Sequence, residues 1–265
     1  MVVGVALESR LFEQRVALVP AVVSSMTKAG IQVLVEKSAG KSAGYADSLF
    51  EEQGARITSD REELFKTADI IAQVHGLEDG SVQNNLLRSD QVLVGLLNPF
   101  SVPQAVRQLA EKGVTSFALE LLPRISRAQP MDALTSMATI SGYKAVLIAA
   151  GLLNKMFPMM MTAAGTITPA RVLVIGVGVA GLQAIATARR LGASVQAYDV
   201  RPVVKEQVES LGAKFVELKL ETKETEAADG YAKAMDEEFY RRQRDLMKRV
   251  VAENDIVITT AAIPG

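Results

Sequence analysis

The sequence contains no cysteine and no tryptophan, and its single histidine is His75. The absence of cysteine excludes disulfides, thiolate zinc sites, iron–sulfur clusters and a cysteine nucleophile, and it is typical of a reducing compartment. One histidine cannot form a multi-histidine metal site, and it argues against a Ser-His-Asp triad. We therefore expect a function that uses no metal ion bound by the chain.

Charge of one sign and long hydrophobic runs are also lacking. The 265 residues carry 29 Lys and Arg against 30 Asp and Glu, a net charge of −1, which gives no electrostatic footprint for nucleic acid or anionic lipid. The most apolar stretch, 145–153, rises only about 13 Å as a helix, less than half the hydrocarbon core of a bilayer. We interpret it as part of a buried helix, and we expect neither a membrane span nor a nucleic-acid partner.

What is present is an ordinary globular composition, with 49% hydrophobic and 22% charged residues, and an alternating pattern. Short apolar runs predict strands at 2–7, 31–36, 69–74, 91–97 and 114–118. Amphipathic segments predict helices at 21–29 and 102–112, and Asp47 and Ser59-Asp60 are the expected N-caps of two shorter helices. Strands that alternate with such helices require crossover connections, and so a mostly parallel sheet.

The alternation stops at 119–129, which has no apolar periodicity and is expected to be a loop. A long helix, capped by Asp132 or Ser136 and running to about Met156, is expected next, and a second alternating unit follows it. The predicted fold is therefore α/β, with two Rossmann-like, doubly wound parallel-sheet domains joined by a long helix and a cleft between them. The predicted segments are an N-terminal domain (1–130), a connecting helix (131–160) and a nucleotide-binding domain (161–265).

The strongest local signal is a glycine-rich turn between a β-favouring run, 171–175, and an expected helix, 180–191. The turn has the spacing G-x-G-x-x-G, and an acidic residue ends the next expected strand about twenty residues later, as in the dinucleotide-binding fingerprint. The free N–H groups and the dipole of the helix then bind a pyrophosphate. A glycine turn that serves packing alone is the alternative.

Each residue of this fingerprint has a separate task. Gly176 allows the tight turn, Gly178 lets the backbone approach the pyrophosphate, and Gly181 permits close contact between helix and strand. Asp199 accepts hydrogen bonds from the adenosine ribose and repels a 2′-phosphate, which favours NAD(H) over NADP(H). Arg201 leaves this preference open, because an arginine nearby can hold that phosphate.

A polar segment precedes the long helix and contains Arg124, Gln129 and Asp132. Arg124 and Asp132 can pair and fix the segment, and Gln129 offers the donor and the acceptor that a carboxamide such as that of nicotinamide requires. The alternative, which composition alone favours, is a solvated loop with an ion pair of little energetic value.

Together these motifs resemble the NAD(H)-binding domain I of the proton-translocating nicotinamide nucleotide transhydrogenases, relatives of the alanine dehydrogenases. The resemblance covers the whole chain and rests on Glu8, Arg15–Pro20, Pro123–Gln129, Asp132, Thr162–Gly165, Gly176–Leu182, Asp199–Pro202, Lys205–Val208, Gly230–Lys233 and Thr259–Gly265. It departs from the family pattern at Pro130, Thr135 and Thr139, of which Thr135 keeps a hydroxyl.

The resemblance implies direct hydride transfer between NAD(H) bound by this chain and NADP(H) bound on a partner domain. A separate membrane-spanning domain would couple this transfer to proton translocation. Catalysis would consist of positioning two nicotinamides. The resemblance also implies a homodimer that is cytoplasmic and peripherally associated with the inner membrane through partner subunits.

The resemblance further assigns roles to individual residues. Gln129 would place the nicotinamide, with Arg124 and Asp132 bracing it, and these three form the expected catalytic group. Gly230 and Tyr231 would form a lid. The expected NAD(H) contacts are Arg124, Gln129, Asp132, Thr135, Gly176, Gly178, Val179, Ala180, Gly181, Asp199, Val200, Arg201, Gly230, Tyr231, Gln243 and Ala262.

Two other functions stay open. An alanine dehydrogenase-like amino-acid oxidoreductase needs a lysine and a histidine to bind and deprotonate its substrate. Those positions fall near His75 and Asn98, and neither motif looks like the dehydrogenase one, so His75 is interpreted as incidental. The other function is an NAD(H)-binding subunit without chemistry of its own. Because the family's domain continues beyond Gly265, we expect this chain to be a truncated form.

Overall fold

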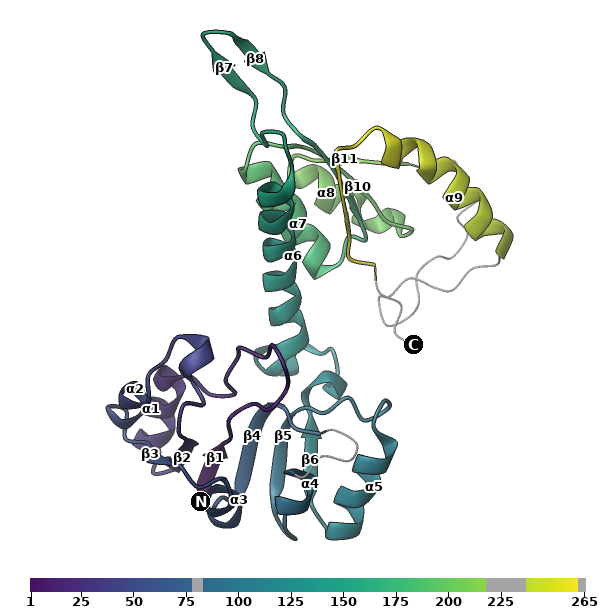
Figure 1. Cartoon of the computed structure of the whole chain (residues 1–265). Coiled ribbons are helices and arrows are strands. Elements are labelled where there is room, and N and C mark those ends of the chain that lie inside the picture. Colours follow the sequence, from purple (N-terminus) through teal and green to yellow (C-terminus); the bar gives the residue numbers. More distant parts are fainter. Residues whose placement is uncertain (78–82, 218–236, 262–265) are drawn as a thin grey trace. The chain divides into compact units, whose positions relative to one another are not determined.

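Figure 1 shows the computed structural model of the chain, which describes residues 1–77, 83–217 and 237–261. The chain forms two compact units, unit 1 (Met1–Ala133) and unit 2 (Leu134–Gly265). Each is built around its own parallel sheet with helices in the crossover connections. The predicted α/β class with two Rossmann-like, doubly wound units is confirmed.

Unit 1 contains a six-stranded sheet in the order β3-β2-β1-β4-β5-β6, in which all neighbours are parallel. Its strands are β1 (Val2–Val5), β2 (Gln32–Glu36), β3 (Arg56–Thr58), β4 (Ile70–His75), β5 (Val92–Leu96) and β6 (Thr115–Ala118). The chain winds outward from β1 in one direction and then from β4 in the other. The carboxyl ends of β1 and β4 therefore meet at the point where the strand order reverses, which is where such sheets usually bind ligands.

Helices connect these strands and cover both faces of the sheet. They are α1 (Pro20–Lys28), α2 (Asp47–Glu51), α3 (Arg61–Thr67), α4 (Gln83–Leu86) and α5 (Pro103–Lys112), with 3₁₀ turns η1 (Lys41–Ala43), η2 (Leu119–Leu121) and η3 (Ser126–Met131). Alternate residues of β2 belong to different apolar clusters, since Val33 and Val35 pack with Phe50 while Leu34 packs with Phe65. Burial on both faces explains why the interiors of the central strands β1 and β2 are apolar.

Unit 2 contains a four-stranded parallel sheet in the order β11-β10-β9-β12. Its strands are β9 (Arg171–Ile175), β10 (Ser194–Tyr198), β11 (Lys214–Phe215) and β12 (Ile256–Thr259). The helices are α6 (Ala133–Leu152), α7 (Val179–Arg190), α8 (Lys205–Ser210) and α9 (Glu237–Ala252), with one 3₁₀ turn, η4 (Pro202–Val204). One apolar cluster lies between the sheet and its helices, and it includes Val172, Val174, Ile185 and Val195.

An antiparallel hairpin, β7 (Met160–Thr162) and β8 (Gly165–Ile167), joins α6 to β9. Its base lies against the end of α7. Gly192 follows α7 with φ +90°, and a Cβ placed on it would lie 2.7 Å from the Pro158 Cβ. Every residue of the two strands is exposed in the isolated chain.

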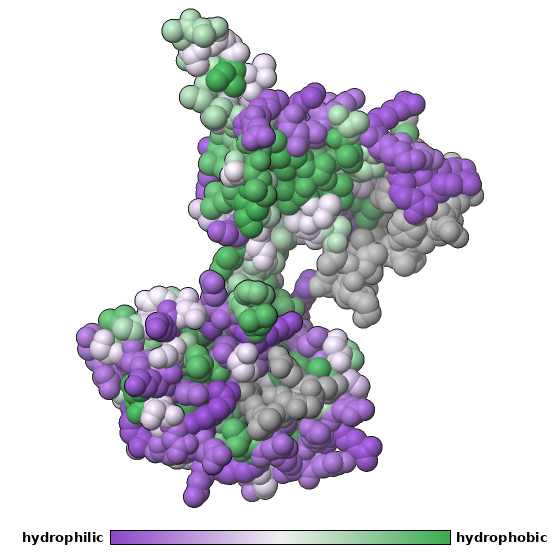
Figure 2. Space-filling view, in the orientation of Figure 1, coloured by the Kyte–Doolittle hydropathy of each residue, from purple (hydrophilic) through white to green (hydrophobic). Residues whose placement is uncertain are grey.

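The interpretation of 145–153 as a buried helix is wrong. Of the twenty residues of α6 only Gly142 and Val146 are buried, while Ile148 and Leu152 are 51% and 77% exposed. Because α6 is covered on one side only, its remaining apolar residues face outward, and Figure 2 shows hydrophobic residues gathered on one face of unit 2. By length and composition alone α6 is apolar enough to cross a membrane, so the absence of a span stays a prediction.

Candidate functional site

The glycine-rich turn connects the end of β9 to the start of α7, as the sequence predicts. Gly178 is the N-cap of α7 in an extended conformation, and no side chain caps the helix. The first N–H groups of an α-helix have no partner within the helix. The open end of this twelve-residue helix is therefore arranged to receive an anion such as a pyrophosphate.

The three positions of the turn require glycine for different structural reasons. Gly176 has φ +91°, and a Cβ on it would lie 2.6 Å from the Ala261 nitrogen. A Cβ on Gly181 would lie 1.9 Å from the carbonyl oxygen of Gly176. Packing and conformation inside the chain thus account for Gly176 and Gly181.

Gly178 differs from both. Its φ of −85° and ψ of −166° suit any residue. Within the described part of the chain, a Cβ on it would meet no atom within 4 Å. The space in front of Gly178 is therefore open, which is what close approach of a ligand to the backbone requires.

Asp199 follows β10 and is tied to the turn. Its Oδ2 accepts a hydrogen bond from the Val177 N–H at 2.7 Å, and its Oδ1 accepts one from the Arg201 N–H at 2.9 Å. The Asp199 and Arg201 side chains are only 7% and 16% exposed and form an ion pair. Burial raises the pKa of Asp199, but the hydrogen bonds from Arg201 and Val177 outweigh burial and hold this pKa below its usual value.

The start of α7 also contacts α6. A Cβ on Gly142 of α6 would lie 2.1 Å from the carbonyl oxygen of Ala180, so the two helices touch through backbone atoms. Thr135 lies two helical turns before Gly142 and therefore on the same face of α6. Thr139, between them, donates its hydroxyl hydrogen to the Thr135 carbonyl oxygen at 3.1 Å.

The polar segment of unit 1 is more regular than the sequence predicts. The range 119–129 is expected to be a loop, but it contains η2 and most of η3, with Pro130 inside η3. Ala128 is buried at 5% exposure and anchors η3, while Arg124 and Gln129 are exposed and Asp132 is half-buried. The pairing of Arg124 with Asp132 stays a prediction.

The structure thus brings one group of predicted residues together within unit 2: Gly176, Gly178, Val179, Ala180, Gly181, Asp199, Val200 and Arg201. Arg124, Gln129 and Asp132 belong to one short segment of unit 1, which consists of η3 and the residues beside it. Gly230, Tyr231 and Ala262 lie outside the described residues, and Gln243 lies in α9 with its side chain outside them. In the described ranges no group of three or more His, Cys, Asp and Glu side chains could hold a metal ion.

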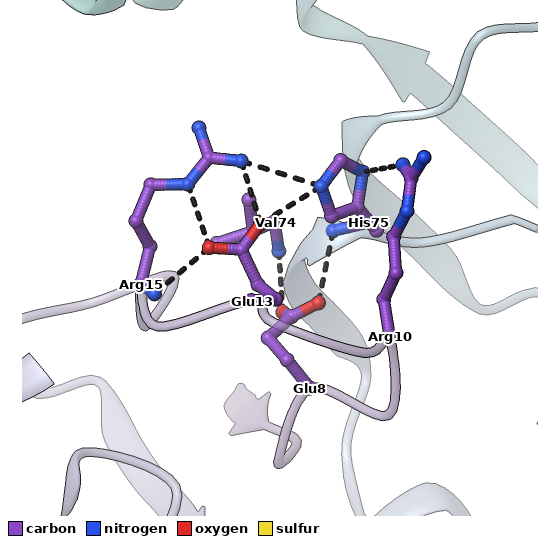
Figure 3. A network of polar contacts seen from close by, with 6 residues as sticks. All are labelled: Glu8, Arg10, Glu13, Arg15, Val74 and His75. Atoms are coloured by element: carbon purple, nitrogen blue, oxygen red, sulfur yellow. Dashed lines mark hydrogen bonds and ion pairs between the residues drawn. The ribbon is translucent and has the colours of Figure 1, made fainter. Parts of the chain in front are cut away.

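Sequence reasoning missed a polar network at the carboxyl ends of β1 and β4 (Figure 3). Glu8 accepts hydrogen bonds from the Val74 and His75 N–H groups at 2.6 and 3.0 Å. Its pKa is raised, because burial outweighs these bonds. The sequence could have predicted this network. Glu8 follows the first expected strand and His75 follows the third, and the carboxyl ends of parallel strands lie at the same edge of a sheet.

The His75 ring is held on both sides in this network. Its Nε2 lies 2.8 Å from Glu13 Oε2, and its Nδ1 lies 3.2 Å from Arg10 Nη1. The Nε2 atom also lies 3.2 Å from Arg15 Nη2, so each ring nitrogen faces a guanidinium group, which can only donate. Arg15 pairs with Glu13 at 2.6 Å, and this contact lowers the pKa of Glu13 to about 2 despite its burial.

The fold and the turn define a two-unit protein of the dinucleotide-binding Rossmann class. The chain belongs to the alanine dehydrogenase/PNT family, because residues 4–141 match its N-terminal domain and residues 145–265 its C-terminal domain. The family resemblance deduced from the sequence is confirmed.

Transhydrogenases are prominent among its relatives. An NAD(P) transhydrogenase alpha-subunit protein of Rhodospirillum rubrum is 46% identical over 269 residues, which cover 100% of this chain and 70% of that protein. The solved transhydrogenase of Sinorhizobium meliloti has a TM-score of 0.87 and 43% identity, over 100% of this chain and 70% of that one. An alanine dehydrogenase of Methanococcus maripaludis is 31% identical over 76% of this chain and 53% of that protein.

Proposed function

We propose that this chain is the NAD(H)-binding component of a proton-translocating transhydrogenase. The observation that carries the nucleotide site is Gly178, because neither conformation nor packing within the described chain calls for glycine there. A pyrophosphate that approaches the backbone closely does call for it. The similarity of the whole chain to a transhydrogenase alpha subunit supports the wider assignment.

The residues of unit 2 fit a dinucleotide. In this proposal the uncapped first turn of α7 offers the N–H groups of Val179, Ala180 and Gly181 to the pyrophosphate. Asp199 accepts hydrogen bonds from the adenosine ribose, with Val200 and Arg201 beside it. Thr135, on the face of α6 that contacts α7, reaches the region between diphosphate and ribose.

The residues of unit 1 are assigned to the nicotinamide. Gln129 hydrogen-bonds the carboxamide through its donor and its acceptor, and Arg124 and Asp132 brace it. Gly230 and Tyr231 act as a lid, and Gln243 and Ala262 are further contacts. NAD(H), when bound, supplies or accepts the hydride, and the chain's own task is to hold the reacting ring in place.

The rest of the reaction belongs to partners in this proposal. NADP(H) is bound on a partner domain, and a separate membrane-spanning domain couples hydride transfer to proton translocation. The present chain works on the cytoplasmic side, peripherally associated with the inner membrane through those partners. NADH affinity measured alone, followed by transhydrogenation after addition of the partner domains, separates this proposal from an NAD(H)-binding subunit without chemistry.

We also propose that the chain is a homodimer. Ile148 on α6 is 51% exposed, and Met159 and Met161 on the hairpin are 63% and 84% exposed. A two-stranded hairpin is only marginally stable without packing. A second copy that covers the hairpin and α6 would explain why the hairpin forms and why the apolar side chains of α6 are exposed in a single chain. A dimer by analytical ultracentrifugation that becomes a monomer in Met161→Asp supports this, whereas a monomeric wild type that floats with lipid vesicles contradicts it.

The nucleotide site is tested by Gly178→Ala. The added methyl group meets nothing inside the described chain, so the free energy of unfolding stays near that of the wild type, but NADH affinity falls about tenfold or more. Gly151→Ala is the matched control, because its Cβ also meets nothing within 4 Å and the site is elsewhere. Equal NADH affinity in the two variants overturns the assignment.

An alanine dehydrogenase-like activity is the second candidate. It is favoured by the relative that is an alanine dehydrogenase, and by the polar network at the point where the strand order of unit 1 reverses, which is where such sheets usually bind ligands. NAD-dependent oxidative deamination of L-alanine at an ordinary enzymatic rate would establish it in place of transhydrogenation.

A further inference from the structure

The carboxylate of Asp199 is fully engaged by its own chain. Its Oδ1 accepts from the Arg201 backbone N–H and from Arg201 Nε at 2.9 and 3.0 Å. Its Oδ2 accepts from the Val177 N–H at 2.7 Å and from Arg201 Nη2 at 3.1 Å. A carboxylate has about four lone-pair positions, so a ribose hydroxyl must replace one of these bonds to donate to Asp199.

Arg201 donates three of those four bonds, and it also contacts the glycine-rich turn. Its guanidinium meets both carboxylate oxygens as a planar fork, the geometry that also suits phosphate. The same Nη2 donates to the Val177 carbonyl oxygen at 3.3 Å. Arg201 therefore joins the end of β10 to the glycine-rich turn.

We propose that Asp199 and Arg201 together set the preference for NAD(H) over NADP(H). Arg201 positions the Asp199 carboxylate. The Arg201 guanidinium could also bind a 2′-phosphate, but its ion pair with Asp199 prevents this. The proposal rests on the proposed NAD(H) site. It accounts for an arginine next to the ribose position of a chain expected to prefer NAD(H).

The physical basis is an exchange of partners. A ribose hydroxyl can replace the longest of the four bonds, that from Nη2, and the carboxylate then keeps its other three. A 2′-phosphate is mostly a dianion at neutral pH, so Asp199 repels it, and the guanidinium with which it would pair is already neutralised by that carboxylate. With asparagine at position 199 the negative charge is gone, one acceptor for the Val177 N–H remains, and the fork can turn to the phosphate.

The experiment compares wild type, Asp199→Asn, Arg201→Gln and the double variant in NADH and NADPH titrations followed by nucleotide fluorescence at one ionic strength. Wild type is expected to prefer NADH. Asp199→Asn should bind NADPH about tenfold more tightly than wild type does, and the double variant should lose that gain. The control is Arg56→Gln, which removes an arginine from the exposed pair with Glu63 in unit 1 and should change neither affinity.

Two results overturn the inference while NADH binding by the wild type stands: no gain of NADPH affinity in Asp199→Asn, or a gain that persists in the double variant. Failure of wild type to bind NADH overturns the nucleotide site and this inference together. If circular dichroism shows that Asp199→Asn is unfolded, Asp199→Ser replaces it in the same comparison.

The positioning role has a separate readout in the pH profile. Without Arg201, burial raises the pKa of Asp199 with less compensation, so the acid limb of NADH binding moves to higher pH in Arg201→Gln. Arg201→Lys should move it part of the way back. A merely structural role would lower affinity by the same factor at every pH, and that result overturns the assignment.

Discussion

The contact between α6 and α7 can be measured by a pair of matched substitutions. Gly142 and Gly151 both lie in α6, and alanine gains about 1 kcal/mol of helix propensity at Gly142, in the interior, and less at Gly151, the second-to-last residue. At Gly151 the new Cβ meets nothing within 4 Å, whereas at Gly142 it would lie 2.1 Å from the Ala180 carbonyl oxygen. Because the gain in propensity is at least as large at Gly142 as at Gly151, a lower stability of Gly142→Ala reports the clash.

That cost follows from the geometry. A backbone atom cannot swing aside as a side-chain tip can, so α6 must move from α7 or the first turn of α7 must shift, and overpacking of this kind costs about 1–3 kcal/mol. We expect Gly142→Ala to be less stable than Gly151→Ala by that amount in urea unfolding followed by circular dichroism. Because the displaced atoms begin the proposed pyrophosphate site, NADH affinity should also fall in Gly142→Ala alone. Equal unfolding midpoints for the two variants would refute the reasoning.

Two further predictions concern the polar residues of unit 1. The contact with Arg15 lowers the pKa of Glu13 from its usual 4.5 to about 2, so its stabilisation, on the order of 3 kcal/mol, is complete above pH 4.5 and is lost as the pH falls from there toward 2. In urea titrations the stability gap between wild type and Glu13→Gln should therefore shrink across that window, and a gap that stays constant contradicts the assignment. Gln129→Asn, in the complex assembled with partner domains, should slow hydride transfer much more than it weakens NADH binding in stopped-flow and equilibrium measurements. Equal losses in both would remove the positioning role of Gln129.

Much of the fold was accessible from local pattern. The expected strands of unit 1 are present within a few residues of their predicted ends, and Asp60 caps α3 by accepting from the Glu63 N–H at 3.1 Å. The edge strands β3 and β11, with three and two residues, are too short to produce a periodic signal. Local pattern therefore found the elements that carry their own hydrophobic repeat and missed those that pairing alone creates.

The features that the sequence did not predict share a physical cause, which is that a side chain can bind a residue far away in the sequence. Asp47 is expected to cap α2, but the N-cap is Ala46, because Asp47 instead accepts the Ser38 N–H at 2.8 Å. Glu8 and His75 meet although 67 positions separate them. The burial of α6 was unpredictable for the same reason, because an apolar run does not show whether other residues of the chain pack against it.

The glycine-rich turn was the region of the site that sequence could specify, because strand, turn and helix are contiguous there. The engagement of Asp199 by Arg201 was not predictable to the same degree. Two residues in sequence can as easily point apart, and only the turn after β10, fixed by η4, directs both side chains to one place.

The contact between Pro158 and Gly192 links the β7–β8 hairpin to one end of α7. A helix of twelve residues is about 18 Å long and behaves as a stiff rod. One end of this rod bears on the base of the β7–β8 hairpin, and the other end opens onto Gly178. If the hairpin base tilts α7 as one body, the N–H groups at the turn move with it.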